Sequence, residues 1–225
     1  MSRLTEMYDR LTDWLRSAGD WVAPLGLRLL LAHEFYKAGV MKAGVDGVPG
    51  WFAGKGFPLP FDWLPANLNW AMVTWTEILA GIALALGLFT RFFAFSLVVV
   101  TTIAIASTHW PESWDSLGQL WQGYSVSRVV EDGEFRGNFR VPMLFLAMLL
   151  PLVFMGGGKL SVDHLLVKLL GRADLVHARS DDLLALSLAL LIPGIVLLYL
   201  IPLWGIVLLL AALASAVLHR IRKAA

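Results

Sequence analysis

Several apolar stretches, each long enough to cross a lipid bilayer, constrain this chain more than any other feature of its sequence. About 20 apolar residues in a helix cover the roughly 30 Å of hydrocarbon in a bilayer. The stretches lie at 22–40, 69–89, 92–109, 139–155 and 183–218. Composition agrees, because 58% of the residues are hydrophobic and only 16% are charged, whereas about a quarter of a soluble domain is charged. The sequence therefore predicts an all-α fold, a polytopic membrane helical bundle.

The last stretch, 183–218, is too long for one crossing, because as a single helix it would extend about 54 Å. Pro193 is expected to kink it, and the segment 202–205 is predicted to form a turn, so two helices in a hairpin are expected. Six membrane spans are the first interpretation. Four spans with a hairpin that only dips into the membrane are the second.

The N-terminal residues 3–20 place apolar and charged side chains on opposite faces of a helix. This pattern is typical of an amphipathic helix on a membrane surface. The predicted organisation has three parts: an amphipathic interfacial helix (1–21), a four-helix membrane core with outer caps at 43–68 and 110–138 (22–170), and a C-terminal membrane hairpin with a basic tail (171–225).

Lys and Arg residues set the orientation, because they are enriched on the cytoplasmic side of membrane proteins. They are more numerous near both termini and in the connections after residues 89 and 155 than in the other two connections. We therefore predict a multi-pass membrane protein with both termini in the cytoplasm.

Two long connections, 43–68 and 110–138, then lie on the outer side. Both are rich in Trp and Phe, which favour the membrane interface, so we predict that they cap the bundle. In the second, an Asp-Gly pair at 132–133 lies between two β-prone runs and predicts a small β-hairpin. On the inner side, 161–170 predicts a short amphipathic helix that ends at the following glycine.

Ionisable residues interrupt the first apolar stretch at Arg28, His33, Glu34 and Lys37. Each ionised group near a bilayer centre opposes insertion by about 3 kcal/mol, so an unpaired set is not expected to face lipid. On a helix, His33, Glu34 and Lys37 share one face. We expect this face to converge under the outer caps with three further residues, Lys42, Glu77 and His109, and we expect Glu34 and Glu77 to be buried. A structural polar cluster and a functional site both remain open.

Three chemistries fit this cluster. A quinone headgroup would accept hydrogen bonds from His33 or Lys37, and a proton relay would use Glu34 and Glu77. Copper would bind His33 and His109 together with Met41, Met72 or Met143, because thioethers suit Cu(I). The chain has no cysteine, so it offers no thiolate ligand or thiol redox centre. Its net charge of +1 and the absence of a phosphate-binding glycine loop give no indication of nucleic acid.

Three sequence blocks resemble the DoxX family of small bacterial membrane proteins. The first is Arg28 with Gly39-Val-Met-Lys42, and the second and most specific is Glu77-xxx-Gly81 followed by Gly87-Leu-Phe-Thr-Arg91. The third is Gly-Gly-Gly-Lys-Leu-Ser161-Val-Asp163. They occur in family order over about residues 22–166, and His33, Glu34 and Lys37 lie outside them. The resemblance implies a four-helix core in which Gly39, Gly81 and Gly87 permit close helix contacts. We expect Arg91 and Asp163 to form a structural ion pair.

DoxX-like proteins are tied to redox tasks, and the overall layout resembles an HvfX-like subgroup associated with copper-binding modified peptides. The resemblance implies an inner-membrane accessory protein, linked to copper homeostasis or oxidative stress, that assists maturation or export of such a peptide. Its partners would be the lipid bilayer and proteins or a small peptide encoded nearby, with oligomers also compatible. The alternative is a quinone-interacting membrane subunit of an oxidoreductase such as thiosulfate:quinone oxidoreductase. The sequence does not decide whether the cofactor is a quinone or copper.

Overall fold

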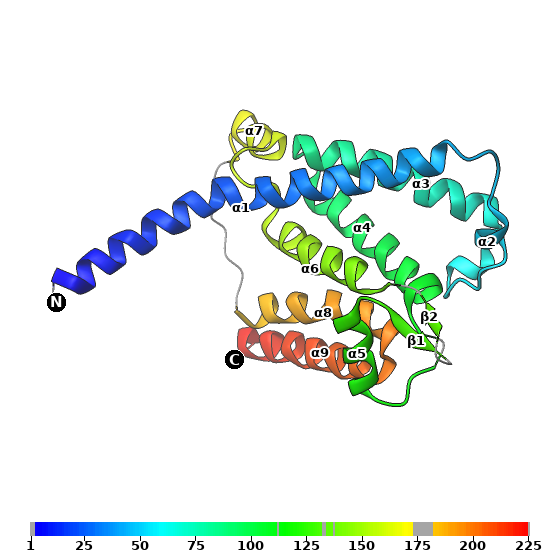
Figure 1. Ribbon diagram of the computed structural model, residues 1–225. Helices are drawn as coiled ribbons and strands as arrows, with labels where there is room; N and C mark the ends of the chain where they lie inside the picture. Colours follow the sequence, from blue (N-terminus) through cyan, green and yellow to red (C-terminus); the bar gives the residue numbers. More distant parts are fainter. Residues whose placement is uncertain (1–2, 112, 132–133, 137, 173–181, 225) are drawn as a thin grey trace. The chain divides into compact units, whose positions relative to one another are not determined.

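The computed structural model describes residues 3–111, 113–131, 134–136, 138–172 and 182–224, which form two compact units (Figure 1). Unit 1 consists of Met1–Gly54, Pro65–Val100 and Leu144–Arg172. Unit 2 consists of Lys55–Leu64, Thr101–Met143 and Ala173–Ala225. Two helices, α4 (Thr90–Ala104) and α6 (Arg140–Met155), contribute residues to both units.

Unit 1 is built around two helices that lie side by side, α1 (Arg3–Ala43) and α3 (Ala66–Leu86) (Figure 1). Parts of α4 and α6 complete its packing, together with α2 (Gly50–Ala53) and α7 (Val162–Leu169). The most deeply buried apolar side chains of this unit are Leu31, Ala80, Leu84, Ala94, Leu97 and Leu149. They come from all four long helices, so one apolar core holds the unit together.

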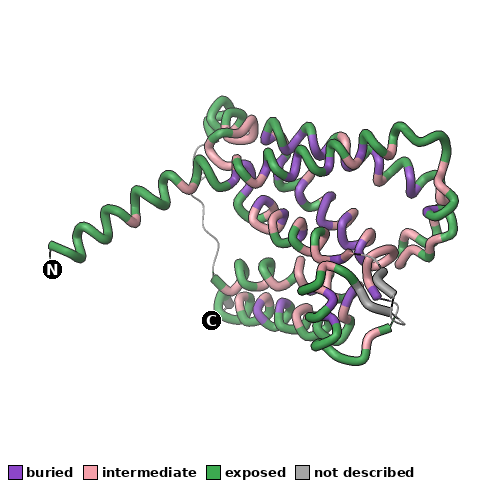
Figure 2. Tube along the Cα trace, in the orientation of Figure 1, coloured by how far each residue is buried: buried purple, intermediate pink, exposed green. Residues whose placement is uncertain are grey.

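The predicted surface helix and the first predicted span are one continuous helix, α1. Figure 2 shows the N-terminal part of α1 as almost entirely exposed, and the buried face begins at Pro24. Proline normally breaks a helix because it cannot donate to the carbonyl four residues before it. Here that carbonyl, on Asp20, accepts a hydrogen bond of 3.0 Å from the backbone N–H of Lys159 instead. The loop before α7 therefore satisfies the group that proline leaves free, and α1 continues.

The short helix α7 begins at Ser161, whose Oγ accepts a hydrogen bond of 3.1 Å from the backbone N–H of His164. Such a side-chain cap satisfies one of the free N–H groups of a helix start. Beyond its end, Gly171 takes the left-handed conformation with a φ of 65°. The prediction of a short helix that ends at this glycine is confirmed.

Unit 2 contains the short helix η1 (Phe61–Trp63), the π-helical turn η2 (Ile105–His109) and α5 (Leu117–Val126). A small antiparallel hairpin follows, in which β1 (Val129–Glu131) pairs with β2 (Glu134–Arg136). The predicted β-hairpin is thus confirmed, although its Asp-Gly turn at 132–133 lies outside the described residues.

The C-terminal part of unit 2 is a helical hairpin of α8 (Asp182–Leu200) and α9 (Pro202–Ala224). Proline is well tolerated in a first helical turn, so Pro202 starts α9 directly after the break at Ile201. At the open end, Ser215 Oγ donates to the carbonyl of Leu183 at 2.9 Å. The predicted hairpin is confirmed, and Pro193 lies within α8. The turn predicted at 202–205 is wrong, because these residues belong to α9 and the break lies at Ile201.

Four helical segments in the described part of the chain are long and apolar enough to cross a membrane: Ala66–Leu86, Thr90–His109, Asp182–Leu200 and Pro202–Lys223. The apolar helix α6 is shorter, with 16 residues. The predicted span within α1 does not meet the same criterion, because it carries Arg28, Glu34 and Lys37. The chain is therefore an all-α, polytopic membrane protein. Crossings by α1 and α6, which would make six, stay a prediction.

Candidate functional site

The side chain of Arg28 is fully buried in unit 1. Its Nη1 donates to the carbonyl of Leu84 at 3.3 Å, and its Nη2 donates to the carbonyl of Leu160. Arg28 thus ties α1 to the last turn of α3 and to the loop before α7. Gly87 makes room for it, because a Cβ at this position would overlap the Arg28 guanidinium and would lie 2.5 Å from Ser161 Cβ. Gly87 also has a φ of 67°, which glycine adopts without strain.

The carboxylate of Asp163 caps the start of α4. Its Oδ1 accepts from the backbone N–H of Phe89 at 2.7 Å, and its Oδ2 accepts from that of Thr90 at 2.8 Å. The backbone N–H of Asp163 donates to the carbonyl of Gly87 at 2.9 Å. A carboxylate is favoured at this place because free N–H groups and the helix dipole both attract negative charge.

The expected ion pair between Arg91 and Asp163 is wrong. Arg91 Nη2 instead approaches two carbonyl groups at the end of α6, those of Phe154 and Met155, at 3.4 Å each. Carbonyls at a helix C-terminus lack partners within the helix and attract cations. Each charge therefore meets the helix end of opposite polarity, and the two side chains do not meet each other.

Lys42 and Glu77 form an ion pair that joins α1 to α3, with 2.6 Å between Lys42 Nζ and Glu77 Oε2. Glu77 is buried, as expected, with 6% of its surface exposed. The helices approach closely at two glycines. A Cβ on Gly39 would lie 2.7 Å from Ile78 Cγ1, and one on Gly81 would lie 2.8 Å from Tyr36 Cβ. This close approach brings the lysine within reach of the buried carboxylate.

His33, Glu34 and Lys37 are all exposed on α1. The expectation that Glu34 is buried is therefore wrong. The buried face of α1 is already defined by residues at helical spacing: Arg28, Leu31, Ala32, Phe35 and Gly39. Positions 33, 34 and 37 fall outside that face. Of the predicted polar cluster, the structure brings Lys42 and Glu77 together and leaves His33, Glu34 and Lys37 on the exposed side of α1.

His33 lines an open groove of about 380 Å³ between α1 and α3. The groove is otherwise formed by apolar side chains, a glycine and the ring of a tyrosine: Leu29, Ala32, Tyr36, Gly81, Ile82, Ala85 and Leu86. No hydrogen bond or ion pair joins the His33 imidazole to another residue of the described structure. A single polar ring beside an apolar trough fits a ligand with a small polar head and an apolar body.

His109 lies in unit 2, at the end of the π-helical turn η2. Its Nδ1 is buried and has no hydrogen-bond partner within the described residues. Such turns are frequent at functional sites. Of the predicted copper ligands, Met143 also belongs to unit 2, whereas His33, Met41 and Met72 belong to unit 1. Across the described residues, no three or more His, Asp or Glu side chains are grouped to hold a metal ion. Convergence of the copper ligands, and of His109 with the cluster in unit 1, stays a prediction.

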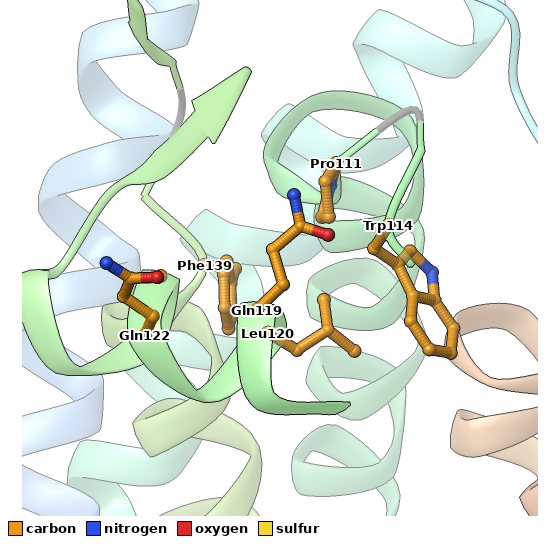
Figure 3. A pocket seen from close by; sticks show the side chains of 7 residues that line it. Pro111, Trp114, Gln119, Leu120, Gln122 and Phe139 are labelled. Carbon is orange, nitrogen blue, oxygen red and sulfur yellow. The ribbon is translucent and has the colours of Figure 1, made fainter. Parts of the chain in front are cut away.

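Unit 2 also contains a pocket of about 160 Å³ that the sequence did not indicate (Figure 3). Its lining combines aromatic and apolar groups with two amides: Pro111, Trp114, Gln119, Leu120, Gln122, Gly123 and Phe139. The sequence predicted only an aromatic cap over 110–138. The only local indication was that Leu120 and Gly123, three positions apart, lie on the same side of α5. Phe139 is distant in the sequence, so its position beside them could not be predicted.

Comparison with known proteins supports the resemblance seen in the sequence. The family model DoxX matches residues 23–110. A protein of Haemophilus influenzae described as uncharacterized is 33% identical over 156 residues, which cover 68% of this chain and 89% of that relative. No solved structure matches the chain.

Proposed function

We propose that this chain, which belongs to the DoxX family, is an accessory protein that assists a partner in the membrane and is not a stand-alone enzyme. The observation that carries the proposal is that the buried charged side chains of unit 1 are bound by other groups of the same chain. Arg28 and Glu77 are the buried charged side chains among the described residues. Backbone carbonyls hold Arg28, and Lys42 holds Glu77. Charges fixed in this way support helix packing, which is the requirement of a scaffold.

The process that we assign to this scaffold is copper homeostasis or the response to oxidative stress at a bacterial inner membrane, with both termini in the cytoplasm. Its partner is a copper-binding modified peptide whose maturation or export it assists. The layout that resembles the HvfX-like subgroup supports this assignment. His33 and His109, with Met41, Met72 or Met143, offer the imidazole and thioether groups that Cu(I) prefers.

Growth of cells that lack the chain tests the assigned process. We expect reduced growth in copper or peroxide, restored by the wild-type chain and restored poorly by Glu77→Gln, which leaves Lys42 unpaired. A variant at an exposed position of α1, Glu34→Gln, serves as the matched control and should restore growth fully. Equal growth with and without the chain under both stresses would show that the process is assigned wrongly.

Metal analysis tests the copper ligands separately. The full-length protein, purified in detergent, is loaded with Cu(I) and its bound copper is measured. We expect the double variant His33→Ala/His109→Ala to lose the copper and the control His164→Ala/His219→Ala to keep it. If both double variants retain the same amount of copper, the two predicted histidines are not its ligands.

A quinone-interacting subunit of an oxidoreductase is the second candidate, and the groove beside His33 favours it. The volume of about 380 Å³ lies within the roughly 300–1,000 Å³ of common small-molecule sites. The imidazole would donate a hydrogen bond to a quinone carbonyl, and the apolar trough would hold the adjoining part of an isoprenoid tail.

Solvent extraction of the purified chain, followed by chromatography, measures any bound quinone. If the groove binds quinone, His33→Leu should lower the bound amount several-fold, because it removes the donor and keeps the surface apolar. His164→Leu, on α7, controls for the loss of a histidine elsewhere. Absence of quinone from the wild-type chain, even after incubation with a soluble quinone analogue, would exclude this candidate.

A further inference from the structure

The pocket of unit 2 is a built feature of the connection between α4 and α6. Phe139 forms one wall, is 4% exposed and packs against Trp110 with 5.2 Å between the ring centroids. Gly123 of α5 lies so close that a Cβ there would be 3.3 Å from Cε1 of this ring. The absence of a side chain at position 123 therefore keeps the pocket open beside the phenylalanine ring.

The loop that carries Trp114 is fixed to the same helix. The backbone N–H of Asp115 donates to Gln119 Oε1 at 2.8 Å, and Ser116 Oγ accepts from the backbone N–H of Gln119 at 3.3 Å. In Figure 3 the Gln119 side chain rises from α5 toward Pro111, and Trp114 stands on the other side of the pocket. These two hydrogen bonds to Gln119 hold the loop that carries Trp114 against the start of α5.

The chemistry of the lining selects an uncharged ligand. Among the described residues, no charged side chain lines the pocket. The polar side-chain groups of this lining are the indole N–H of Trp114, which only donates, and the amides of Gln119 and Gln122, each of which can both donate and accept hydrogen bonds. The Gln119 amide nitrogen and the whole Gln122 amide form no hydrogen bond with any other described residue. An ion would gain no charge partner from this described lining, whereas a neutral amide would match both glutamines.

The size of the pocket limits the ligand further. At about 160 Å³ it is smaller than the roughly 300–1,000 Å³ of sites that enclose a whole small-molecule ligand. It has room for a single apolar or aromatic side chain against Trp114, Leu120 and Phe139. The remainder of the ligand would lie outside, beside the exposed glutamines.

We propose that this pocket binds one uncharged apolar side chain of a peptide segment, with the glutamine amides hydrogen-bonded to the adjoining peptide backbone. The preference for a neutral apolar group follows from the lining alone. The choice of a peptide as its carrier rests on the proposed function. The pocket would then be the place where the chain holds its peptide partner.

Photo-crosslinking tests this proposal on the full-length protein in detergent. The probe is a capped tripeptide, acetyl-Ala-X-Ala-amide, in which X is a leucine analogue that carries a diazirine, and mass spectrometry maps the attachment sites. We expect attachment within 111–123 or at Phe139, and competition by the same tripeptide with leucine. The tripeptide with lysine at X should compete at least tenfold less well, because the described lining is neutral and mainly apolar.

Two variants separate binding from folding. Trp114→Ala removes one wall and should lower crosslinking at least tenfold. Trp121→Ala, on α5, removes an exposed ring that stacks on Tyr124 outside the pocket and should leave crosslinking unchanged. If Trp114→Ala does not fold, Gln122→Leu replaces an exposed amide and should weaken binding several-fold.

Each other outcome overturns a defined part of the proposal. Attachment spread over the membrane helices, or equal competition by lysine and leucine, would show that the pocket does not select an apolar side chain. Competition by N-acetyl-leucinamide as strong as that by the tripeptide would overturn the peptide as the carrier. Selective crosslinking together with normal copper and peroxide growth of cells lacking the chain would leave the pocket intact and reject the proposed function.

Discussion

The charged side chains that bridge elements in unit 1 differ in their hydrogen bonding from the glutamine amides of the pocket in unit 2. In unit 1, Arg28, Asp163 and the Lys42–Glu77 pair each bridge two elements of the chain. In unit 2, the Gln122 amide and His109 Nδ1 have no hydrogen-bond partner within the described residues. Polar groups that bridge elements hold a fold together, whereas those with unused hydrogen-bonding capacity are available to a ligand.

This difference teaches that a charged residue within an apolar stretch indicates either a structural contact or a functional site. The high cost of an unpaired charge in a membrane requires a partner, but a backbone carbonyl satisfies that requirement as well as a substrate does. If the comparison is right, substitutions in unit 1 should mainly lower stability, and substitutions around the pocket should mainly lower binding. The following predictions test the first half of this statement, from the largest effect to the smallest.

Replacing Arg28 by methionine should cause the largest loss of stability. The change removes two hydrogen bonds, from the Arg28 guanidinium to the carbonyls of Leu84 and Leu160. Leu84 keeps its bond from the backbone N–H of Gly87. A hydrogen bond to a charged group contributes about 1.5–3 kcal/mol, so the loss of two makes this the largest expected effect. Thermal unfolding of the purified protein in detergent measures the effect. Arg91→Met is the control, since Arg91 is exposed and makes only long contacts, and it should change stability little. A similar effect of both substitutions would contradict the special role of the buried arginine.

The Lys42–Glu77 pair should behave as a coupled unit. Lys42→Met alone leaves the buried Glu77 carboxylate without its partner and should lower stability by about 3 kcal/mol. The double variant Lys42→Met/Glu77→Gln removes both charges and should recover much of that loss, because a neutral pair avoids the unpaired charge. A double-mutant cycle of unfolding free energies gives the coupling. Additive losses would show that the contact between the two side chains contributes nothing.

The glycine at the helix crossing should tolerate no methyl group. Gly81→Ala places a Cβ 2.8 Å from Tyr36 Cβ, and overpacking of this kind costs about 1–3 kcal/mol. Gly26→Ala, in α1, is the matched control, because a Cβ there meets nothing within 4 Å. Alanine favours a helix over glycine, so this control should raise stability by about 0.5–1 kcal/mol. Equal losses in both variants would mean that the crossing is looser than the structure indicates.

Local patterns in the sequence predicted much of the fold. Apolar length predicted the membrane helices, and the excessive length of 183–218 predicted the hairpin of α8 and α9. Asp-Gly between β-prone runs predicted the hairpin of β1 and β2. Each of these signals acts through neighbouring residues. The continuity of α1 could not be predicted in this way, because it depends on a hydrogen bond from Lys159 to the carbonyl left free by Pro24, a contact between distant parts of the chain.

The candidate sites were less predictable for the same reason. The sequence singled out Glu77 and Lys42, but nothing local distinguished lysine 42 from lysine 37 as the partner of the carboxylate. The capping of α4 by Asp163 joins residues more than seventy positions apart, and the pocket of unit 2 needs α5 and Phe139 together. Helical periodicity shows which residues share a face, but only the packing of the fold decides which face contacts another helix.

The smallest effect on stability is expected at the residue that first suggested a site. His33 is exposed and makes no polar contact within the described structure, so His33→Leu should leave thermal unfolding in detergent unchanged, as exposed substitutions usually do. Alanine at the neighbouring buried position, Leu31→Ala, should lower stability by about 2–5 kcal/mol. A loss of quinone or copper in His33→Leu at unchanged stability would assign the histidine to a ligand. A clear loss of stability would instead show that His33 helps to hold unit 1 together. The distinction on α1 between polar side chains that join two elements and those available to a ligand would then be wrong.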